Sequence, residues 1–237
     1  MTFLDEMKGA AATYGLTLSE EQLRRFQKYY DLLLEWNGRM NLTAITEPRE
    51  VALKHIIDSL AGWKDHMAED SRLIDVGTGA GFPGIPLKIY RPNLRLTLLD
   101  SLGKRVKFLE AVTEELGLEG AICIHGRAED AARNKNLREK FQIAVSRAVA
   151  RLPILAEYCL PFVEPGGMFL AWKGAQYREE AQEAQRAVTL LGGKDIEMEE
   201  IHLPGMEDQR AILRIPKIAP TPKTYPRRAG IPERKPL

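Results

Sequence analysis

The sequence predicts an α/β fold, in which a mostly parallel sheet of seven strands carries helices on both faces. From Arg72 onward, short apolar runs alternate with longer segments of helical periodicity, the pattern typical of parallel strands joined by helices. A glycine-rich turn follows the first apolar run directly, and an acidic residue ends the second. Two late apolar runs have no helical segment between them, which indicates an antiparallel hairpin at one edge of the sheet.

Residues 1–65 carry helical patterns and are expected to form an N-terminal helical cap. Ser19 is followed three positions later by Gln22, which is the spacing of a capping box at a helix start. We expect Asn37-Gly38 to end this helix, and a further helix to run over roughly 48–60. Apolar side chains recur at helical spacing in the first of these helices at Leu23, Phe26, Tyr30, Leu33 and Trp36.

The segment from 66 to 216 is expected to hold the sheet and its helices. Parallel strands are expected near 73–76, 95–99, 121–125, 141–146 and 167–172. Helices are expected near 84–90, 103–116, 128–134, 152–162 and 175–191. The hairpin strands are expected near 195–202 and 210–215, with a turn at 205–208. Residues 217–237 are basic and rich in proline, which predicts an extended tail.

Composition restricts the class of protein. With 237 residues and 44% hydrophobic composition, the chain suits one generous domain, or one domain with a small appendage. No apolar run approaches the roughly 18 residues of a membrane helix, and the acidic N-terminus is unlike a signal peptide. We therefore expect a cytoplasmic protein that makes no membrane contact. Cys123 and Cys159 lack metal-site spacing and are expected in the core, and no metal is expected.

Charge is distributed unevenly along the chain. From Lys217 onward, six basic residues stand against one acid, which gives this segment a net charge of +5. The remaining 28 basic and 32 acidic residues give the body a net charge of −4. A basic tail on a slightly acidic body indicates contact with a polyanion, although a simply solvated terminus would have the same composition.

The glycine-rich turn predicts a site for a nucleotide-like ligand. A short buried strand at 73–76 leads directly into Gly77-Thr78-Gly79-Ala80-Gly81-Phe82-Pro83-Gly84. Glycines at alternate positions let the backbone approach a ligand, and the following helix points its free N–H groups at the same place. Asp100 ends the second strand, 19 positions beyond Gly81, and its carboxylate is placed to accept the hydroxyl protons of a ribose.

Two cofactors fit such a turn, a nicotinamide dinucleotide and S-adenosylmethionine. Three features favour S-adenosylmethionine: the late hairpin, a Gly-x-Gly-x-Gly spacing in place of Gly-x-Gly-x-x-Gly, and the lack of an evident hydride-transfer domain after the sheet. The expected fold is therefore that of a class I (Rossmann-like) methyltransferase, with the helical cap in front of it.

Motifs over nearly the whole chain are similar to those of one family. They comprise Asp75 to Leu87, Asp100-Ser101-Leu102, Gly126-Arg127-Ala128-Glu129, Ser146-Arg147-Ala148 and Lys173-Gly174, with Trp36-Asn37 and Met40-Asn41-Leu42-Thr43 upstream and Tyr225-Pro226-Arg227-Arg228-Ala229-Gly230-Ile231-Pro232 downstream. In this order they resemble the RsmG (GidB) family of bacterial small-subunit ribosomal RNA methyltransferases. The resemblance implies methyl transfer from S-adenosylmethionine to N7 of a guanine in 16S ribosomal RNA, near the decoding site. The implied partner is 16S RNA or the 30S subunit, and a monomer is expected.

The resemblance also implies cofactor-binding residues. Gly77 and Phe82 in the turn, Ala128 and Glu129 after the third strand, and Arg147 after the fourth match the family's positions. Asp100 is added on the ribose argument above. The full expected set is Asp75, Gly77, Thr78, Gly79, Gly81, Phe82, Asp100, Ser101, Ala128, Glu129 and Arg147.

The chemistry of N7 agrees with the residues in the chain. Guanine N7 has a free lone pair, so its methylation requires no general base, and Arg147 and Lys173 are expected as positioning residues. Exocyclic-amine methyltransferases usually carry an Asn/Asp-Pro-Pro-aromatic motif where Ser146-Arg147-Ala148 stands here, and cytosine-C5 enzymes need a nucleophilic cysteine, commonly in a Pro-Cys pair that this chain lacks. Expected contacts to RNA are Asn41, Thr43, Lys173, Arg227, Arg228 and Lys235.

Some assignments have simpler alternatives. Arg147 suits either the cofactor carboxylate or an RNA phosphate, and Lys173 could be an ordinary lysine at a strand end. His55 and Asp58 share one helix face, where a surface ion pair is the simpler interpretation and a substrate role the alternative. Two functional alternatives also stay open: a methyltransferase for another nucleic acid or a protein, and a non-catalytic RNA- or nucleotide-binding module.

Overall fold

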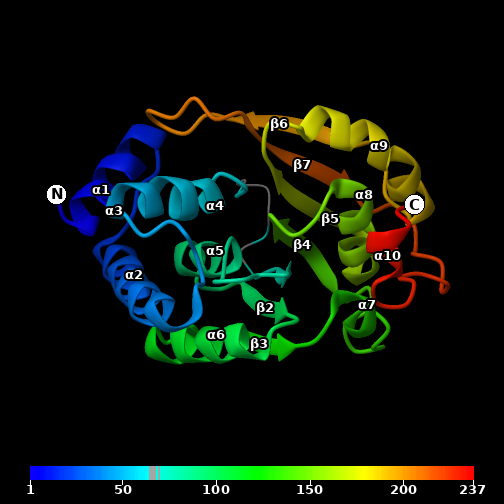
Figure 1. The fold of residues 1–237 in the computed structure, drawn as a ribbon, viewed down its shortest axis with the longest axis horizontal. Helices are drawn as coiled ribbons and strands as arrows, with labels where there is room; N and C mark the ends of the chain where they lie inside the picture. The colour runs from blue at the N-terminus through cyan, green and yellow to red at the C-terminus, as the bar shows by residue number, and fades with distance from the viewer. Residues whose placement is uncertain (64–67, 69) are drawn as a thin grey trace.

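A seven-stranded sheet forms the centre of the computed structural model, which describes residues 1–63, 68 and 70–237. The strand order is β3-β2-β1-β4-β5-β7-β6 (Figure 1). Strands β1 to β5 pair in parallel, whereas β7 is antiparallel to both β5 and β6. This confirms a mostly parallel sheet with a late antiparallel hairpin. The strands are β1 (Arg72–Val76), β2 (Arg95–Asp100), β3 (Ala121–His125), β4 (Phe141–Arg147), β5 (Val163–Lys173), β6 (Glu197–Ile201) and β7 (Arg210–Pro216).

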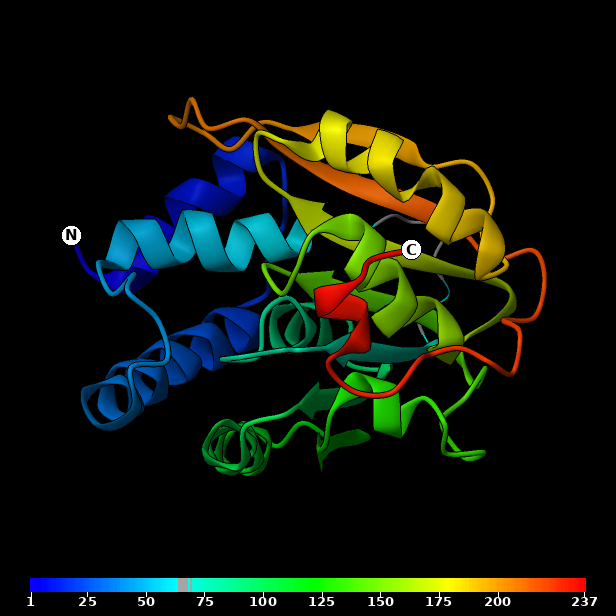
Figure 2. The same cartoon turned by 45° about the vertical axis from the view of Figure 1, so that its right-hand side comes forward.

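Helices cover both faces of the sheet (Figures 1 and 2). Helices α5 (Gly84–Tyr90) and α6 (Gly103–Glu115) pack on one face, and α8 (Leu152–Cys159) and α9 (Tyr177–Leu190) on the other. Neighbouring residues of a strand point to opposite faces, so Leu73 joins the core under α5 and α6 while Ile74 joins the core under α8 and α9. Because β1 to β5 are parallel, their carboxyl ends all lie at one edge of the sheet. Open α/β folds bind ligands at this edge.

Several of the expected boundaries within the sheet domain differ from those in the structure. The helix expected at 128–134 is the shorter α7 (Ala128–Ala131). Helix α8 ends at Cys159 and continues as the 3₁₀ turn η2 (Leu160–Phe162), because Pro161 cannot donate a helical hydrogen bond. Strand β5 begins at Val163 rather than near 167, with a register shift against β4 at Phe141/Ile143.

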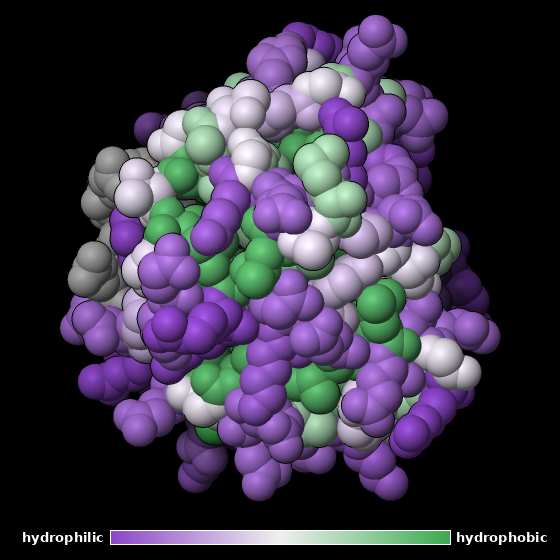
Figure 3. All heavy atoms as spheres, turned by 90° about the vertical axis from the view of Figure 1, so that its left-hand side faces the viewer, coloured by the Kyte–Doolittle hydropathy of each residue, from purple (hydrophilic) through white to green (hydrophobic). Residues whose placement is uncertain are grey.

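The N-terminal residues form helices that pack against the α5 and α6 face. They are α1 (Phe3–Tyr14), α2 (Glu20–Met40) and a continuous helical segment made of α3 (Pro48–Glu50), the π-helical η1 (Val51–Ile57) and α4 (Asp58–Leu60). On the outer side of this part of the molecule, hydrophilic residues surround several separate apolar patches (Figure 3). Helix α2 spans 21 residues, but neither it nor any other helix of the described part is long and apolar enough to cross a membrane.

The start of α2 is as expected, but its end is not. The Gln22 amide donates to Ser19 Oγ at 3.2 Å and the Ser19 amide donates to Gln22 Oε1 at 2.8 Å, which confirms the capping box. The expectation that Asn37-Gly38 ends the helix is wrong. The helix continues to Met40, and Asn41 ends it by adopting a left-handed conformation with φ of 51°. The Asn37 side chain instead accepts from the Thr43 amide at 2.9 Å and fixes the next loop.

The C-terminal segment is folded back onto the domain rather than extended (Figure 2). It ends in a short helix, α10 (Ile231–Arg234), that packs against α8. Two arginines after α7 hold its backbone: Arg133 donates to the Pro226 carbonyl, and Arg138 donates to the carbonyls of Thr221 and Tyr225. Lys217 is buried where the segment begins, and its ammonium donates to the Leu160 carbonyl at 2.8 Å.

Candidate active site

The glycines of the turn after β1 differ in their surroundings. Gly77, Gly79 and Gly81 all have positive φ angles, of 69°, 62° and 98°. A methyl group on Gly79 would meet no heavy atom within 4 Å, so this position borders open space. A methyl group on Gly81 would lie 2.4 Å from Ile85 Cδ1, so Gly81 is required by packing. The turn therefore presents open backbone to a ligand at Gly79 and is held from behind at Gly81.

Asp100 is fixed at the tip of β2 beside this turn. Its side chain is 2% exposed; Oδ2 accepts from the Gly79 amide at 2.9 Å and Oδ1 from the Leu102 amide at 2.9 Å. Each carboxylate oxygen has a further lone pair, so these bonds orient the group without exhausting it. Asp100 lines a cavity together with Gly77, Ser101, Ala128 and Glu129, which brings five expected cofactor residues together.

Two residues that the sequence did not single out complete the wall of this cavity. Tyr158 on α8 and Glu233 on α10 both line it, and Tyr158 Oη donates to Glu233 Oε1 at 3.2 Å. Glu129 is buried and accepts from the Gly230 amide at 3.0 Å. The C-terminal segment thus belongs to this cavity. The motif at 225–232 was the only signal in the sequence for such a role.

Asp75 lies beneath the turn with one of its oxygens unsatisfied. Oδ2 accepts from Thr78 Oγ1 at 2.7 Å and from the Gly84 amide at 2.8 Å. Oδ1 is buried and has no hydrogen-bond partner within the described residues, and burial raises the pKa of Asp75 to about 7. A positively charged ligand in the turn would favour the ionised carboxylate. The open side of Gly79, the oriented Asp100 and this unsatisfied oxygen together fit S-adenosylmethionine, which carries a ribose, an ammonium group and a sulfonium group.

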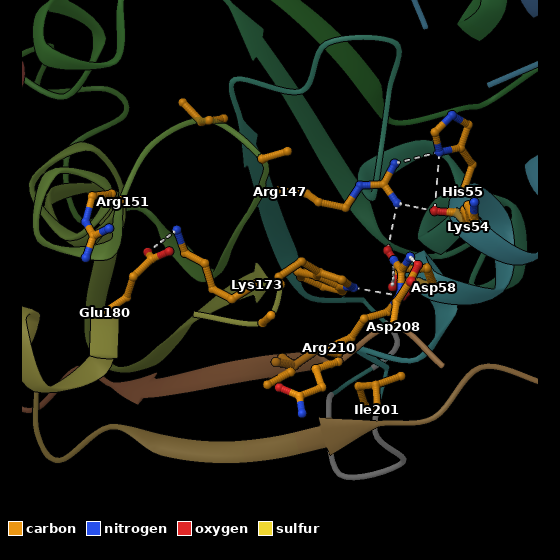
Figure 4. Close-up of a pocket in the computed structure, with 18 of the residues that line it drawn as sticks. Lys54, His55, Asp58, Arg147, Arg151, Lys173, Glu180, Ile201, Asp208 and Arg210 are labelled. Atoms are coloured by element: carbon orange, nitrogen blue, oxygen red, sulfur yellow. Dashed lines mark hydrogen bonds and ion pairs between the residues drawn. The ribbon is translucent and has the colours of Figure 1, made fainter. Parts of the chain in front are cut away.

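Arg147 ends β4 and ties the sheet to the N-terminal helices. Its Nη1 donates to Asp58 Oδ2 at 2.8 Å and to the Lys54 carbonyl at 2.9 Å, and its Nη2 donates to His55 Nδ1 at 3.3 Å (Figure 4). The guanidinium also lies 5.0 Å from the ring centroid of Phe82 in the glycine turn. Arg147 and Phe82 are therefore brought together, but neither is among the residues that line the cavity at Asp100.

His55 and Asp58 are buried, so the expected surface ion pair between them is wrong. Asp58 pairs with Arg147 and, at 3.3 Å, with Arg210 of β7. His55 stacks on Phe82 with ring centroids 4.4 Å apart. Burial, followed by the Arg147 charge, lowers the pKa of His55 to about 3 and keeps the ring neutral. His55 Nδ1 lies 3.3 Å from both Arg147 Nη2 and the Lys54 carbonyl oxygen, and Nε2 lies 2.9 Å from Thr43 Oγ1.

The expected RNA residues of the N-terminal loop lie in different places. Thr43 reaches the site through His55 and accepts from the Ile45 amide. Asn41 is exposed, and its backbone ends α2. Trp172 on β5 is 5% exposed and donates from Nε1 to the Asp58 carbonyl at 2.8 Å.

A second and larger cavity of about 820 Å³ opens beside Arg147. Its wall is formed by the helix at 54–58, the loop after β4, the end of β5 and the late hairpin (Figure 4). Cationic side chains predominate among the charged residues of its wall: Lys54, Arg147, Arg151, Lys173 and Arg210 against Asp58, Glu180 and Asp208. Val149 lines both this cavity and the one at Asp100, so the two cavities meet at the loop after β4.

The basic residues of the C-terminal segment are not equivalent. Arg227 is paired with the fully buried Glu157, with Nη2 to Oε2 at 2.6 Å and Nε to Oε1 at 3.0 Å. Arg228 and Lys235 are exposed. Arg227 is therefore committed to an internal partner, whereas the other two remain accessible.

Comparisons with known proteins place these features in a family. The family model described as rRNA small subunit methyltransferase G matches residues 22–212. A relative from Alkaliphilus metalliredigens, named ribosomal RNA small subunit methyltransferase G, is 51% identical over 98% of this chain and 97% of its own length. A relative of the same name from Clostridium botulinum (strain Eklund 17B / Type B) is 50% identical over 100% of both chains. Among solved structures, the fibrillarin pre-rRNA processing protein of Methanococcus jannaschii shares the fold, with a TM-score of 0.53 and 18% identity over 68% of this chain and 74% of that one.

Proposed function

Because the chain belongs to the rRNA small subunit methyltransferase G family, we propose that it transfers a methyl group from S-adenosylmethionine to N7 of a guanine in 16S ribosomal RNA, near the decoding site. The single observation that carries this proposal is the meeting of the two cavities at Val149. One cavity is lined by Gly77 of the glycine turn and by Asp100. The wall of the other carries five cationic side chains, each of which also pairs with a carboxylate of the protein. A methyl group at their junction would face a base held in the larger cavity.

The residues at this junction hold and orient the cofactor and the base, and none of them is required to transfer a proton. S-adenosylmethionine supplies an electrophilic methyl group on its sulfonium. The N7 lone pair is available without deprotonation, so neutral His55 has no proton to accept. The protein contributes by aligning the nucleophile with the methyl group and by excluding water, effects that supply about 7–11 kcal/mol in favourable cases. We assign this alignment to Arg147, which packs over Phe82 of the cofactor turn and lines the larger cavity.

We also propose where the RNA lies. The larger cavity takes the target nucleotide, with Lys173 on its wall, and the accessible Arg228 and Lys235 contact phosphates outside it. Arg227 we assign to structure, because its guanidinium is bound to buried Glu157. The substrate is proposed to be 16S RNA or the 30S subunit, methylated in the bacterial cytoplasm by a monomer.

The position of the methyl group provides a chemical test of this function. Methylation at N7 puts a positive charge on the guanine ring and labilises the glycosidic bond. Treated 16S RNA should then be cleaved at one guanine after borohydride reduction and aniline treatment, whereas RNA incubated without the protein should not. Incorporation of labelled methyl groups without this cleavage would show that another atom is the acceptor.

Cofactor affinity should depend on Gly79 and Asp100. A side chain at Gly79 would enter the open space beside the turn. Loss of the Asp100 carboxylate removes charge-assisted hydrogen bonds of about 1.5–3 kcal/mol, so the Kd for S-adenosylmethionine should rise roughly tenfold to a hundredfold in Asp100→Ala. Isothermal titration measures this, with the exposed Asp130→Ala as the matched control. Unchanged affinity in a folded Asp100→Ala variant would remove Asp100 from the ribose site.

A further inference from the structure

Lys173 and Glu180 form a partly buried ion pair on the wall of the larger cavity. Lys173 ends β5 and Glu180 lies in the first turns of α9, with Nζ and Oε2 2.7 Å apart (Figure 4). Their side chains are only 6% and 12% exposed, yet both residues line the cavity. A buried pair is well placed for recognition, because hydrogen bonds to a ligand there do not compete with bulk water.

Each member of the pair retains hydrogen-bonding capacity. Lys173 Nζ donates to the Ala150 carbonyl and lies against Glu180, which leaves one of its three protons for a ligand. Glu180 Oε2 also accepts from the Leu152 amide at 2.7 Å. Glu180 Oε1 has no hydrogen-bond partner among residues 1–63, 68 and 70–237. The wall thus presents a donor and a carboxylate oxygen side by side.

Guanine carries the complementary set of groups on one edge. Its O6 accepts a hydrogen bond, while N1–H and the N2 amino group donate. Adenine reverses the pattern, because it has a donor at position 6 and an acceptor at N1. We propose that Lys173 donates to O6 of the target guanine and that Glu180 accepts from N1–H and the N2 amino group. Glu180 is then a specificity-determining residue, and this inference rests on the function proposed above.

The order of the two residues in the fold agrees with the order of groups on the base. In guanine, O6 lies next to N7, and N1 and N2 follow around the ring. If N7 of the base faces the glycine turn, O6 therefore lies closer to that turn than N1 and N2 do. Lys173 is on β5, which pairs directly with β4 beside that turn, and Glu180 is on the helix beyond it. Lys173 Nζ donates to the carbonyl of Ala150, next to Val149 of both cavities, whereas Glu180 Oε2 accepts from the amide of Leu152, two residues further along the chain.

A purely structural role for Glu180 makes a different prediction. Its Oε2 binds the first amide of α8, so the residue also fixes that helix start. If this were its only role, a change at Glu180 would lower the activity on every substrate equally. If Glu180 instead recognises the base, a change at Glu180 alters the ratio of the activities on two substrates that differ only in the recognised group.

The test compares guanosine with inosine at the methylated position. Inosine keeps N7, O6 and N1–H but lacks the N2 amino group. Each 16S RNA is built by ligation and assembled into 30S particles, and methyl transfer is measured as kcat/KM. The unchanged protein should prefer guanosine by about tenfold to a hundredfold, the discrimination given by a good pair of base contacts. In Glu180→Gln, which keeps an acceptor for the Leu152 amide, this preference should fall to about threefold or less.

Glu183→Gln serves as the matched control, because Glu183 lies one turn further along α9 and pairs with the loop residue Arg151 at 2.7 Å. It should keep the preference of the unchanged protein. A Glu180→Gln variant that loses activity equally on both substrates would overturn the proposal. So would an unchanged protein that methylates guanosine and inosine equally, whether or not the variant folds. Failure of the unchanged protein to methylate N7 in either particle would instead contradict the proposed function.

Discussion

Replacement of Arg147 by alanine should both destabilise the protein and reduce methyl transfer by at least about a hundredfold. The arginine is 14% exposed and its partner Asp58 is 6% exposed, so among the residues that the structure describes the variant leaves a buried carboxylate whose remaining ion pair is the longer one with Arg210. Removal of one partner from a buried ion pair costs about 3–5 kcal/mol, and the remaining Arg210 contact places the expected loss near about 3 kcal/mol. Chemical denaturation measures this loss, and a methyl-transfer assay measures the activity.

A lysine at position 147 should not restore the activity that Arg147 provides. One guanidinium bonds Asp58, the Lys54 carbonyl and His55, and at the same time packs over Phe82. An ammonium group is a compact point charge without this planar fork, so Arg147→Lys should recover part of the stability and little of the activity. The control for stability is Arg151→Ala in the loop that follows β4, whose exposed ion pair with Glu183 should contribute less than about 1 kcal/mol. A stable Arg147→Ala variant with full activity would remove Arg147 from the site.

The fold could be predicted from the sequence because its signals are local. The capping box at Ser19 and the glycine turn each lie within a few residues. Where two local signals competed, the prediction failed. Asn37-Gly38 and Asn41 are both plausible helix ends, and the choice depends on the Asn37 side chain, which binds the Thr43 amide in the following loop.

The site could be predicted only in part, because its contacts link distant positions. The spacing of His55 and Asp58 places them on one helix face, but it does not reveal that this face is buried against Arg147, 89 residues beyond Asp58. The ion pair of Lys173 with Glu180 was missed for a different reason: the two residues are only seven positions apart, but their contact depends on the turn between β5 and α9. The glycine turn and Asp100 could be proposed as a ligand site from the sequence because a known ligand chemistry connects them.

The C-terminal segment shows how composition alone misleads. Proline and basic residues are typical of extended, solvated tails. In the structure, Lys217 is buried at the start of the segment, and the Gly230 amide donates to Glu129, which lines the cavity at Asp100. The chain positions that hold the segment, such as Glu157 and Glu129, lie on the domain and carry no sequence signal for this role.

Alanine substitution of two neighbouring arginines of this segment should therefore affect stability very differently. Arg227→Ala removes the guanidinium that pairs with Glu157, whose side chain is fully buried and keeps the hydrogen bond from the amide of residue 227 at 2.7 Å. The expected loss is about 3–5 kcal/mol, which lowers the melting temperature of a chain of this size by about 10 °C. Because Gly230 is anchored to Glu129 a few residues later, the Kd for S-adenosylmethionine should also rise. Arg228→Ala, at an exposed position, should change stability by no more than about 0.5 kcal/mol.

The salt dependence of RNA binding should distinguish the same two variants in the opposite way: we expect it to change in Arg228→Ala and not in Arg227→Ala. A phosphate contact contributes about 0.7 to the slope of log K against log salt for single-stranded RNA. Arg228→Ala should therefore flatten that slope by about 0.7, whereas Arg227→Ala, measured well below its melting temperature, should leave it unchanged. RNA binding at several salt concentrations, alongside thermal melting, measures both effects. An unchanged slope in Arg228→Ala would remove this residue from the RNA site, and a flattened slope in a fully stable Arg227→Ala variant would contradict its structural assignment.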